Sequence, residues 1–254
     1  ATSSRLFTAF LGAIIARRTG AKLYLDIRDI FNDTMNDVLN PRILPVVQPL
    51  LNAIERYTIQ SADRINLVSR GFQKYFSDRY PEKVFSYIPN GIDSEFLTFD
   101  FKKKIEKGKK IIVYAGNIGQ GQGLEKIVPV CAEGIGKDYE FWIIGDGSTK
   151  KALLAKISDN NLSNVKVINP VERSRLLKYY QESDILFMHL NDYDAFKKVL
   201  PSKVFEYAAT GKPIIAGVNG YAKEFIEQNI INAVVFEPCN AADFLNKLKM
   251  LKDD

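Results

Sequence analysis

Lys203 and Glu206 are the residues whose types and spacing most directly suggest chemistry. They stand three positions apart in one short apolar segment, so on a helix they share a face. Ser202 is the predicted N-cap of this helix, and Gly211 is predicted to end it before a buried strand at 214–218. A cation beside free helix amides suits a diphosphate, and a carboxylate one turn later suits two sugar hydroxyls. The alternative is an exposed Lys–Glu pair on a helix that only packs.

A second segment has the pattern of a phosphate-binding turn. A strand is predicted over 111–115, a glycine-rich turn over 116–123 and a helix over 124–135. Glycines let the backbone approach a ligand closely, and the amides at a helix start favour an anion. The turn lacks the GK[ST] ending of a Walker loop and the strict G-x-G-x-x-G context of a dinucleotide fold. By itself this pattern is weak evidence for a nucleotide site.

Taken together, these motifs resemble a known family. The segment PSKVFEYAATGKPI at 201–214 is similar to the donor-site signature of bacterial glycosyltransferases of the GT-B fold. It resembles most the retaining, glycogen-synthase-like branch that builds O-antigens and capsules, in particular the N-acetyl-fucosamine-transferase-like subgroup. The segment PNGID at 89–93 matches the signature that ends the N-terminal domain in that family. The resemblance covers nearly the whole chain, and its motifs occur in the family's order.

The resemblance implies roles for individual residues. Glu206 takes the place of the glutamate that holds the donor ribose, while Ser202, Lys203 and the glycine turn would stabilise the leaving diphosphate. Backbone groups at Val171 would pair with the uracil edge. The residues expected to bind the donor are Asn117, Gly119, Gln120, Gly121, Gly145, Val171, Ser202, Lys203 and Glu206.

This chain also departs from the family pattern. The partner glutamate eight positions before Glu206 is replaced by Lys198, which puts one donor-sugar contact in doubt. The usual arginine and lysine of the glycine turn are Asn117 and Gln122 here. Both changes remove positive charge, so Lys203 becomes the expected phosphate cation.

Arg28 and Asp29 follow a predicted strand at 22–27, and ligand crevices of open α/β sheets form at such strand ends. The resembled subgroup has the same Arg-Asp pair where other family members carry a catalytic-site histidine. Arg28 could hold phosphate while Asp29 contacts a sugar hydroxyl; an internal salt bridge that orders the loop is the equal alternative. His189, after a strand at 184–188, could touch the donor sugar or its phosphate, but a structural role is favoured.

The predicted fold class is α/β, with two Rossmann-like parallel-sheet domains in the GT-B arrangement. We place a partial N-terminal acceptor-side domain at 1–97, a charged linker at 98–110 and a nucleotide-sugar-binding domain at 111–254. The chain starts at once with a helix that in the family lies deep inside the first domain. We therefore expect a chain that lacks the first part of that domain.

Composition excludes several classes. The 254 residues have a net charge of +5 that comes with 30 acidic residues, which argues against a dedicated nucleic-acid binder. Two cysteines without metal spacing indicate a reducing cytoplasm, and one histidine argues against a His-cluster metal site. The apolar run at 6–15 is shorter than a membrane span, and basic residues follow it rather than precede it.

The predicted activity is a retaining glycosyltransferase that moves a sugar from a UDP-sugar, such as a UDP-linked N-acetylated amino sugar, to a lipid-linked saccharide. Lys203, Glu206, Arg28 and Asp29 are the expected catalytic-site residues, with no metal and no cofactor besides the donor substrate. A cytoplasmic enzyme with weak contact to the anionic inner membrane face is expected. The alternatives are a UDP-sugar 2-epimerase, which normally needs further histidines, and a UDP-binding module without turnover.

Overall fold

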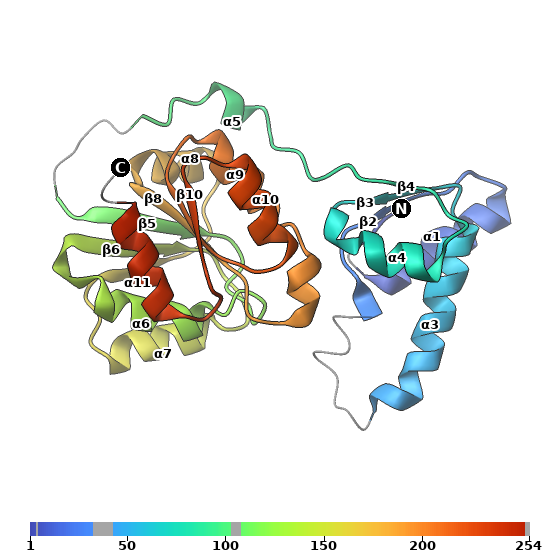
Figure 1. The fold of residues 1–254 in the computed structure, drawn as a ribbon, viewed down its shortest axis with the longest axis horizontal. Helices are drawn as coiled ribbons and strands as arrows, with labels where there is room; N and C mark the ends of the chain where they lie inside the picture. The colour runs from blue at the N-terminus through green and yellow to red at the C-terminus, as the bar shows by residue number, and fades with distance from the viewer. Residues whose placement is uncertain (4, 33–42, 103–107, 252–254) are drawn as a thin grey trace. The chain divides into compact units, whose positions relative to one another are not determined.

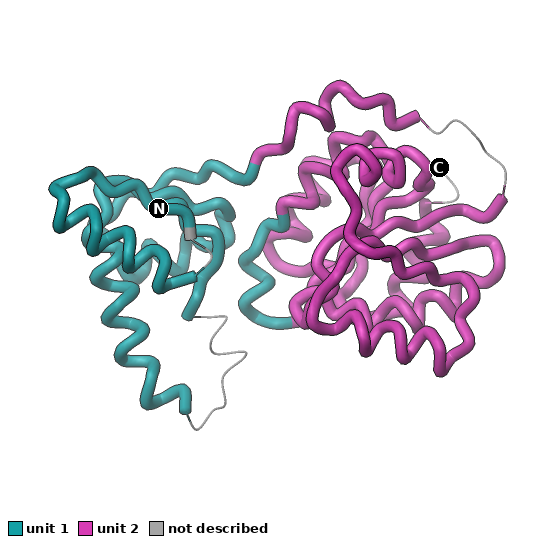
Figure 2. Tube along the Cα trace, turned by 180° about the vertical axis from the view of Figure 1, so that it is seen from behind, with its two compact units in different colours: residues 1–90, 193–201 teal, residues 91–192, 202–254 magenta. Residues whose placement is uncertain are grey.

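The computed structural model describes residues 1–3, 5–32, 43–102 and 108–251. The chain forms two compact units. The first contains residues 1–90 and 193–201, and the second contains residues 91–192 and 202–254 (Figure 2). The middle of the expected linker, residues 103–107, lies outside the described residues. The boundaries at 97 and 110 stay a proposal.

The first unit is built on a parallel sheet in the order β1-β2-β3-β4 (Figure 1). Its strands are β1 (Thr2–Ser3), β2 (Tyr24–Ile27), β3 (Arg64–Leu67) and β4 (Phe85–Ser86). Its helices are α1 (Leu6–Thr19), α3 (Leu44–Ser61) and α4 (Gln73–Arg79), with a short 3₁₀ turn at Arg70–Phe72 before α4. Apolar side chains of β2 and β3 form one core with those of α1, α3 and α4.

Helix α3 begins earlier than the sequence predicts. We expect a helix from Leu50, after three prolines, whereas α3 starts at Leu44. Pro45 sits in the first turn, where its missing N–H has no helical partner to lose, and Pro49 removes only one further helical hydrogen bond. The burial of Leu51, Thr58 and Ile59 holds the helix despite that loss.

The second unit has a six-stranded parallel sheet in the order β10-β9-β8-β5-β6-β7 (Figure 1). Its strands are β5 (Lys110–Ala115), β6 (Tyr139–Ile144), β7 (Val165–Ile168), β8 (Ile185–His189), β9 (Ile214–Gly217) and β10 (Ala233–Phe236). Counted within the unit, this is the 3-2-1-4-5-6 order of the Rossmann fold. The strand order reverses between β5 and β8, so a ligand crevice is expected at the carboxyl ends of the strands there.

Helices cover both faces of this sheet. One face carries α6 (Leu124–Gly134), α7 (Lys150–Asp159) and α11 (Ala241–Met250), whose apolar residues join the buried strand residues in the main core. The other face carries α8 (Arg173–Glu182), α9 (Lys203–Ala209) and α10 (Tyr221–Asn229) (Figure 1). A short helix, α5 (Glu95–Thr98), precedes the sheet in the chain. The predicted α/β class with parallel sheets is confirmed.

Candidate functional site

A pocket of about 450 Å³ lies in the second unit, at the carboxyl ends of β5, β6 and β7. Residues of α8 and α9 form the rest of its wall. The lining residues are Ala115, Gly116, Asn117, Ile144, Gly145, Asp146, Pro170, Val171, Arg173, Leu176, Tyr180, Lys203 and Glu206. Its size and its mixture of apolar and charged groups suit a small-molecule ligand.

Glycines allow two turns of the pocket to touch through their backbones. Gly116 follows β5 with φ +146°, and Gly145 follows β6 with φ +149°. A Cβ on Gly145 would overlap the carbonyl oxygen of Gly116, and a Cβ on Gly116 would overlap Lys203 Nζ. The overlap at Gly145 is with backbone, so close approach requires glycine there; at Gly116 the positive φ is what favours glycine, because the end of the Lys203 side chain can move.

Lys203 projects from the first turn of α9 against Gly116. Its Nζ lies 5.5 Å from the centre of the Tyr114 ring, and the Tyr114 hydroxyl donates to the carbonyl oxygen of Asn117 at 2.6 Å. Burial lowers the pKa of the Lys203 ammonium, and the nearby Glu206 carboxylate partly opposes that change. An incoming anion would replace the solvation that Lys203 lacks.

Glu206 faces an arginine from the neighbouring helix. Arg173 Nη1 lies 3.5 Å from Glu206 Oε1, and Arg173 Nη2 contacts the carboxylate of Asp93. The Arg173 guanidinium also lies over the Phe96 ring, 5.1 Å from its centre. The pocket wall thus contains two cations, Lys203 and Arg173, and two carboxylates, the half-buried Glu206 and the exposed Asp146.

The family model for glycosyl transferases group 1 matches residues 95–254 of the chain. The chain belongs to the group 1 glycosyltransferases. WcaI of Escherichia coli (strain K12), named as a colanic acid biosynthesis glycosyl transferase, is 24% identical over 230 residues, which cover 86% of this chain and 56% of WcaI. The amylovoran biosynthesis glycosyltransferase AmsK of Erwinia amylovora is 23% identical over 154 residues, which cover 59% of this chain and 38% of AmsK. The chain thus spans about half or less of the length of these relatives.

Solved structures show the same fold. The crystal structure of Anabaena HepE in complex with UDP and glucose matches with a TM-score of 0.76 and 16% sequence identity. The match covers 100% of this chain and 68% of HepE. The GT-B-like fold predicted for this group 1 glycosyltransferase is confirmed.

The predicted donor-site residues fall into two sets. Asn117, Gly145, Val171, Lys203 and Glu206 line the pocket together. The others are not among its lining residues, and their role in binding stays a prediction: Gly119, Gln120, Gly121 and Ser202.

The glycine turn is held from behind by Asn191. Its side-chain amide donates to the carbonyl oxygen of Gln120 at 3.0 Å, and its backbone N–H donates to that of Gly121 at 2.8 Å. The carbonyl oxygens of Gln120 and Gly121 therefore stabilise the conformation of the glycine turn through Asn191.

The predicted N-cap position of Ser202 is confirmed, but its side chain does not cap the helix. Ser202 occupies the N-cap position of α9, but its side chain makes no capping hydrogen bond. Its backbone is already helical, with φ −58° and ψ −29°. A capping side chain reaches the amides of the first turn from an extended backbone.

Arg173 is the main pocket residue that sequence reasoning missed. It stands two residues after Val171, which ends the segment expected to meet the base, and it is the first residue of α8. A basic residue at the start of a helix after a strand exit was the available signal. Its partners Asp93 and Glu206 lie 80 and 33 residues away in the sequence, so no local pattern identifies the contact.

The remaining predicted residues, Arg28 and Asp29, belong to the first unit. Arg28 Nη1 lies 4.0 Å from Asp26 Oδ2, so Arg28 makes an internal salt bridge, and its partner is Asp26. Lys198, at the position of the missing glutamate, also belongs to this unit; its carbonyl oxygen accepts from Ser69 Oγ at 2.6 Å. Catalytic roles for Arg28 and Asp29 stay predictions.

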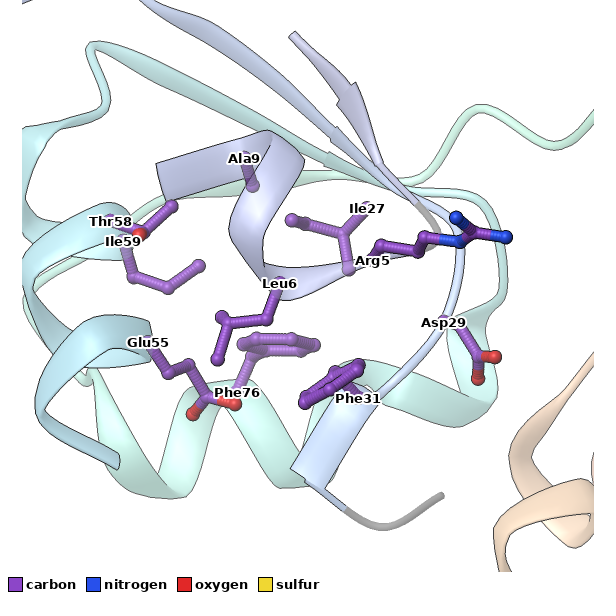
Figure 3. Close-up of a pocket in the computed structure, with 10 residues that line it drawn as sticks. All are labelled: Arg5, Leu6, Ala9, Ile27, Asp29, Phe31, Glu55, Thr58, Ile59 and Phe76. Carbon is purple, nitrogen blue, oxygen red and sulfur yellow. The ribbon is translucent and has the colours of Figure 1, made fainter. Parts of the chain in front are cut away.

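Asp29 lines a small cavity of about 30 Å³ in the first unit, with room for one or two water molecules (Figure 3). Among the lining side chains, Leu6, Phe31 and Phe76 lie near one another, and Glu55 lies to one side of them (Figure 3). Asn32, Tyr75 and Tyr80 donate hydrogen bonds to the buried Glu55 carboxylate. This network satisfies a buried charge, as packing requires.

His189 has a structural role, which agrees with the favoured prediction. It is 2% exposed, its Nδ1 lies 2.6 Å from the carbonyl oxygen of Gln122, and its Nε2 accepts from the backbone N–H of Cys239 at 2.9 Å. Because the carbonyl oxygen can only accept, Nδ1 carries the proton; because Nε2 accepts a hydrogen bond, it carries none. The imidazole is therefore neutral, and both of its nitrogens are hydrogen-bonded. His189 does not line the pocket.

This neutral histidine should make the second unit less stable in acid. Burial, supported by repulsion from Lys126, lowers the pKa of His189 from 6.5 to about 4. His189 therefore binds a proton near pH 6.5 in the unfolded chain but stays neutral in the folded chain until about pH 4. Proton binding favours the unfolded state, so the free energy of unfolding falls as pH falls from 7 towards 4. Between pH 7 and 5 we expect a loss of about 2 kcal/mol in the free energy of unfolding.

The single tryptophan, Trp142 in β6, reports unfolding of this unit in urea by its fluorescence. His189→Gln, which keeps a donor and an acceptor, should be destabilised at pH 7 but should lose most of this pH dependence. An unchanged dependence in the variant would assign the effect to other groups.

Among the residues that the structure describes, no group of three or more His, Cys, Asp or Glu side chains is placed to hold a metal ion. Within the same residues, no helix is both long and apolar enough to cross a bilayer.

Proposed function

We propose that this chain is the donor-binding part of a retaining glycosyltransferase that uses a UDP-sugar, such as a UDP-linked N-acetylated amino sugar. The observation that carries the proposal is the pocket that joins Lys203, Glu206, Val171 and the two glycine turns at the carboxyl ends of a Rossmann sheet. HepE, which has the same fold, was crystallised with UDP and glucose. The names of WcaI and AmsK support a place in cell-surface polysaccharide synthesis.

The proposed binding mode assigns one part of the donor to each wall. The uracil edge pairs with backbone groups at Val171, and the ribose hydroxyls donate to the Glu206 carboxylate. The diphosphate lies against the turn at Gly116 and Gly145, where Lys203 Nζ is close to the glycine backbone. A strongly anionic group restores to Lys203 the solvation that burial removes.

In this reaction the bond between the sugar's anomeric carbon and the β-phosphate oxygen breaks. The acceptor hydroxyl oxygen forms the new bond on the same face of the sugar, and its proton passes to the departing phosphate. Negative charge grows on the diphosphate as it leaves, so a preorganised cation and backbone amides lower the barrier. Lys203 is the residue of this chain that supplies that charge.

The test has two stages. Calorimetric titration with UDP, ADP, GDP and CDP should show binding that is selective for UDP. The protein is then incubated with a radiolabelled UDP-sugar and a lipid-linked saccharide, and label should move to the lipid. Epimerised donor without acceptor would favour a 2-epimerase; UDP binding without turnover would favour a binding module. No binding of any nucleotide overturns the proposal.

A lipid-linked acceptor places the enzyme at a membrane surface, and the outer faces of α1 and α3 suit weak contact with anionic lipids. On α1, Phe7, Leu11 and Ile15 recur every four residues and are each more than half exposed. Val46 and Leu50 of α3 are 79% and 62% exposed. Arg17 and Arg18 end α1, and the only acidic residue of the two helices is the buried Glu55. Exposed apolar residues beside arginines are typical of interfacial helices.

We expect the protein to sediment with vesicles that contain anionic phosphatidylglycerol, and less with pure phosphatidylcholine. The double variant Leu11→Glu/Ile15→Glu should reduce sedimentation about tenfold, because it removes exposed apolar contacts and adds charge that anionic lipid repels. Leu154→Glu, at an exposed leucine of α7 in the second unit, is the matched control. Equal sedimentation of all three proteins would contradict the membrane contact.

A further inference from the structure

The contacts of Arg173 suggest a function that neither the sequence motifs nor the resemblance assigns. Its guanidinium contacts two carboxylates from distant parts of the second unit, Asp93 and Glu206. Arginine presents its donors as a rigid planar fork, which suits such bridging better than the point charge of a lysine. The Arg173 side chain is 37% exposed, and it lies over the buried Phe96 ring.

The Asp93 end of this arrangement is anchored. Asp93 belongs to the PNGID segment, and the carbonyl oxygen of Asp93 accepts from the backbone N–H of Phe96 at 3.0 Å. Phe96 is 1% exposed and packs against Tyr180 of α8, with ring centres 6.2 Å apart. Asp93 and the Phe96 ring therefore hold the guanidinium from one side while α8 supplies its backbone.

The Glu206 end faces the pocket. Arg173 Nη1 approaches only Oε1, at 3.5 Å, and within the described residues Oε2 has no hydrogen-bond donor. The Glu206 side chain is 24% exposed and lines the cavity, so a ligand in the cavity can reach the carboxylate. One oxygen is thus directed to the arginine and the other is available to a ligand.

Charge gives a second reason for the arrangement. A carboxylate close to a bound diphosphate is repelled by it, and the repulsion is stronger in a partly desolvated pocket. The guanidinium of Arg173 lies between the carboxylates of Glu206 and Asp93, so it offsets part of the charge of Glu206 and reduces the repulsion of the diphosphate. Asn117 and Gln122 add no positive charge of their own to this pocket.

We infer that Asp93 and Arg173 form a positioning pair that orients Glu206 towards the ribose hydroxyls and so sets the preference for a ribonucleotide donor. The inference rests on the proposed UDP-sugar site. Arg173 acts through Glu206, and Asp93 acts through Arg173.

The experiment measures dissociation constants for UDP and for 2′,3′-dideoxy-UDP by calorimetry. The dideoxy compound lacks both ribose hydroxyls that would donate hydrogen bonds to Glu206. The ratio of the two dissociation constants therefore reports the contribution of these hydroxyls to binding. The wild-type protein should prefer UDP, and Glu206→Gln should lose most of the preference. Arg173→Met should lower the ratio about tenfold, the usual size of one hydrogen bond to a charged group. Asp93→Asn should lower it in the same direction, and Arg173→Lys should restore only part of it.

Arg175→Met is the matched control, because Arg175 stands on the same helix but does not line the pocket. Trp142 fluorescence in urea confirms that each variant remains folded. A double variant, Arg173→Met with Glu206→Gln, should bind UDP no more weakly than Glu206→Gln alone if Arg173 acts through Glu206. Wild-type protein that binds no UDP would overturn the donor-site proposal and this inference with it. UDP preference that Arg173→Met leaves unchanged would overturn the positioning pair alone.

Discussion

Glu206→Ala is expected to remove most of the stabilisation that UDP gives to this chain. A ligand that binds only the folded state adds about 2.7 kcal/mol at a hundred times its dissociation constant. Loss of a charged hydrogen-bond acceptor for the ribose weakens binding by about 1.5–3 kcal/mol. At the same UDP concentration the variant should therefore keep only about 0.3–1.3 kcal/mol of the added stability.

The comparison is made within each protein, with and without UDP, because removal of Glu206 also leaves Arg173 with one carboxylate fewer and changes the ligand-free stability. Thermal unfolding followed at Trp142 gives both values. Glu227→Ala, at an exposed glutamate of α10 in the same unit, should keep the full UDP effect. A full UDP effect in Glu206→Ala would show that the ribose is held elsewhere.

The second unit is the part of the fold that the sequence predicts best. Its strands predicted at 111–115, 184–188 and 214–218 lie within one residue of the observed ends. Each is a short apolar run between turn residues, and most of their side chains are buried in a parallel sheet that has helices on both faces. Local pattern and tertiary environment agree there.

Where the prediction fails, tertiary contacts decide the outcome. The start of α3 at Leu44 depends on the packing of Leu51 and Ile59, which outweighs the prolines. Lys203 and Glu206 are predictable as site residues because both lie in one short segment of the sequence, three positions apart. The sequence does not identify Arg173 because its partners come from elsewhere in the chain. It locates the N-cap position at Ser202, but whether the side chain makes a capping hydrogen bond depends on the backbone angles there.

Both the pocket wall and the stability of the second unit depend on the absence of a Cβ at Gly145. Its φ of +149° is one that L side chains rarely adopt, and its Cα lies against the carbonyl of Gly116. The backbone on both sides is fixed: Gly116 N–H donates to Ile144 O at 2.8 Å, and Gly145 N–H donates to Ile168 O at 2.9 Å. A methyl group here meets backbone that cannot rotate away.

Gly145→Ala should therefore destabilise the second unit by about 3 kcal/mol or more, through backbone strain and overpacking together. Urea unfolding followed at Trp142, three residues before the substitution, measures the change.

Gly136→Ala is the matched control, since Gly136 has φ +72° but nothing within 4 Å of an added Cβ, so it should cost only about 1–2 kcal/mol. Gly136 has an αL-like φ that costs an L residue less than the φ of Gly145, so the excess loss in Gly145→Ala combines its rarer φ with the overlap with Gly116. UDP binding should fall in Gly145→Ala even where the protein remains folded, because separation of the two turns reshapes the wall beside Lys203. Equal destabilisation by both substitutions would show that the contact between the turns relaxes at little cost.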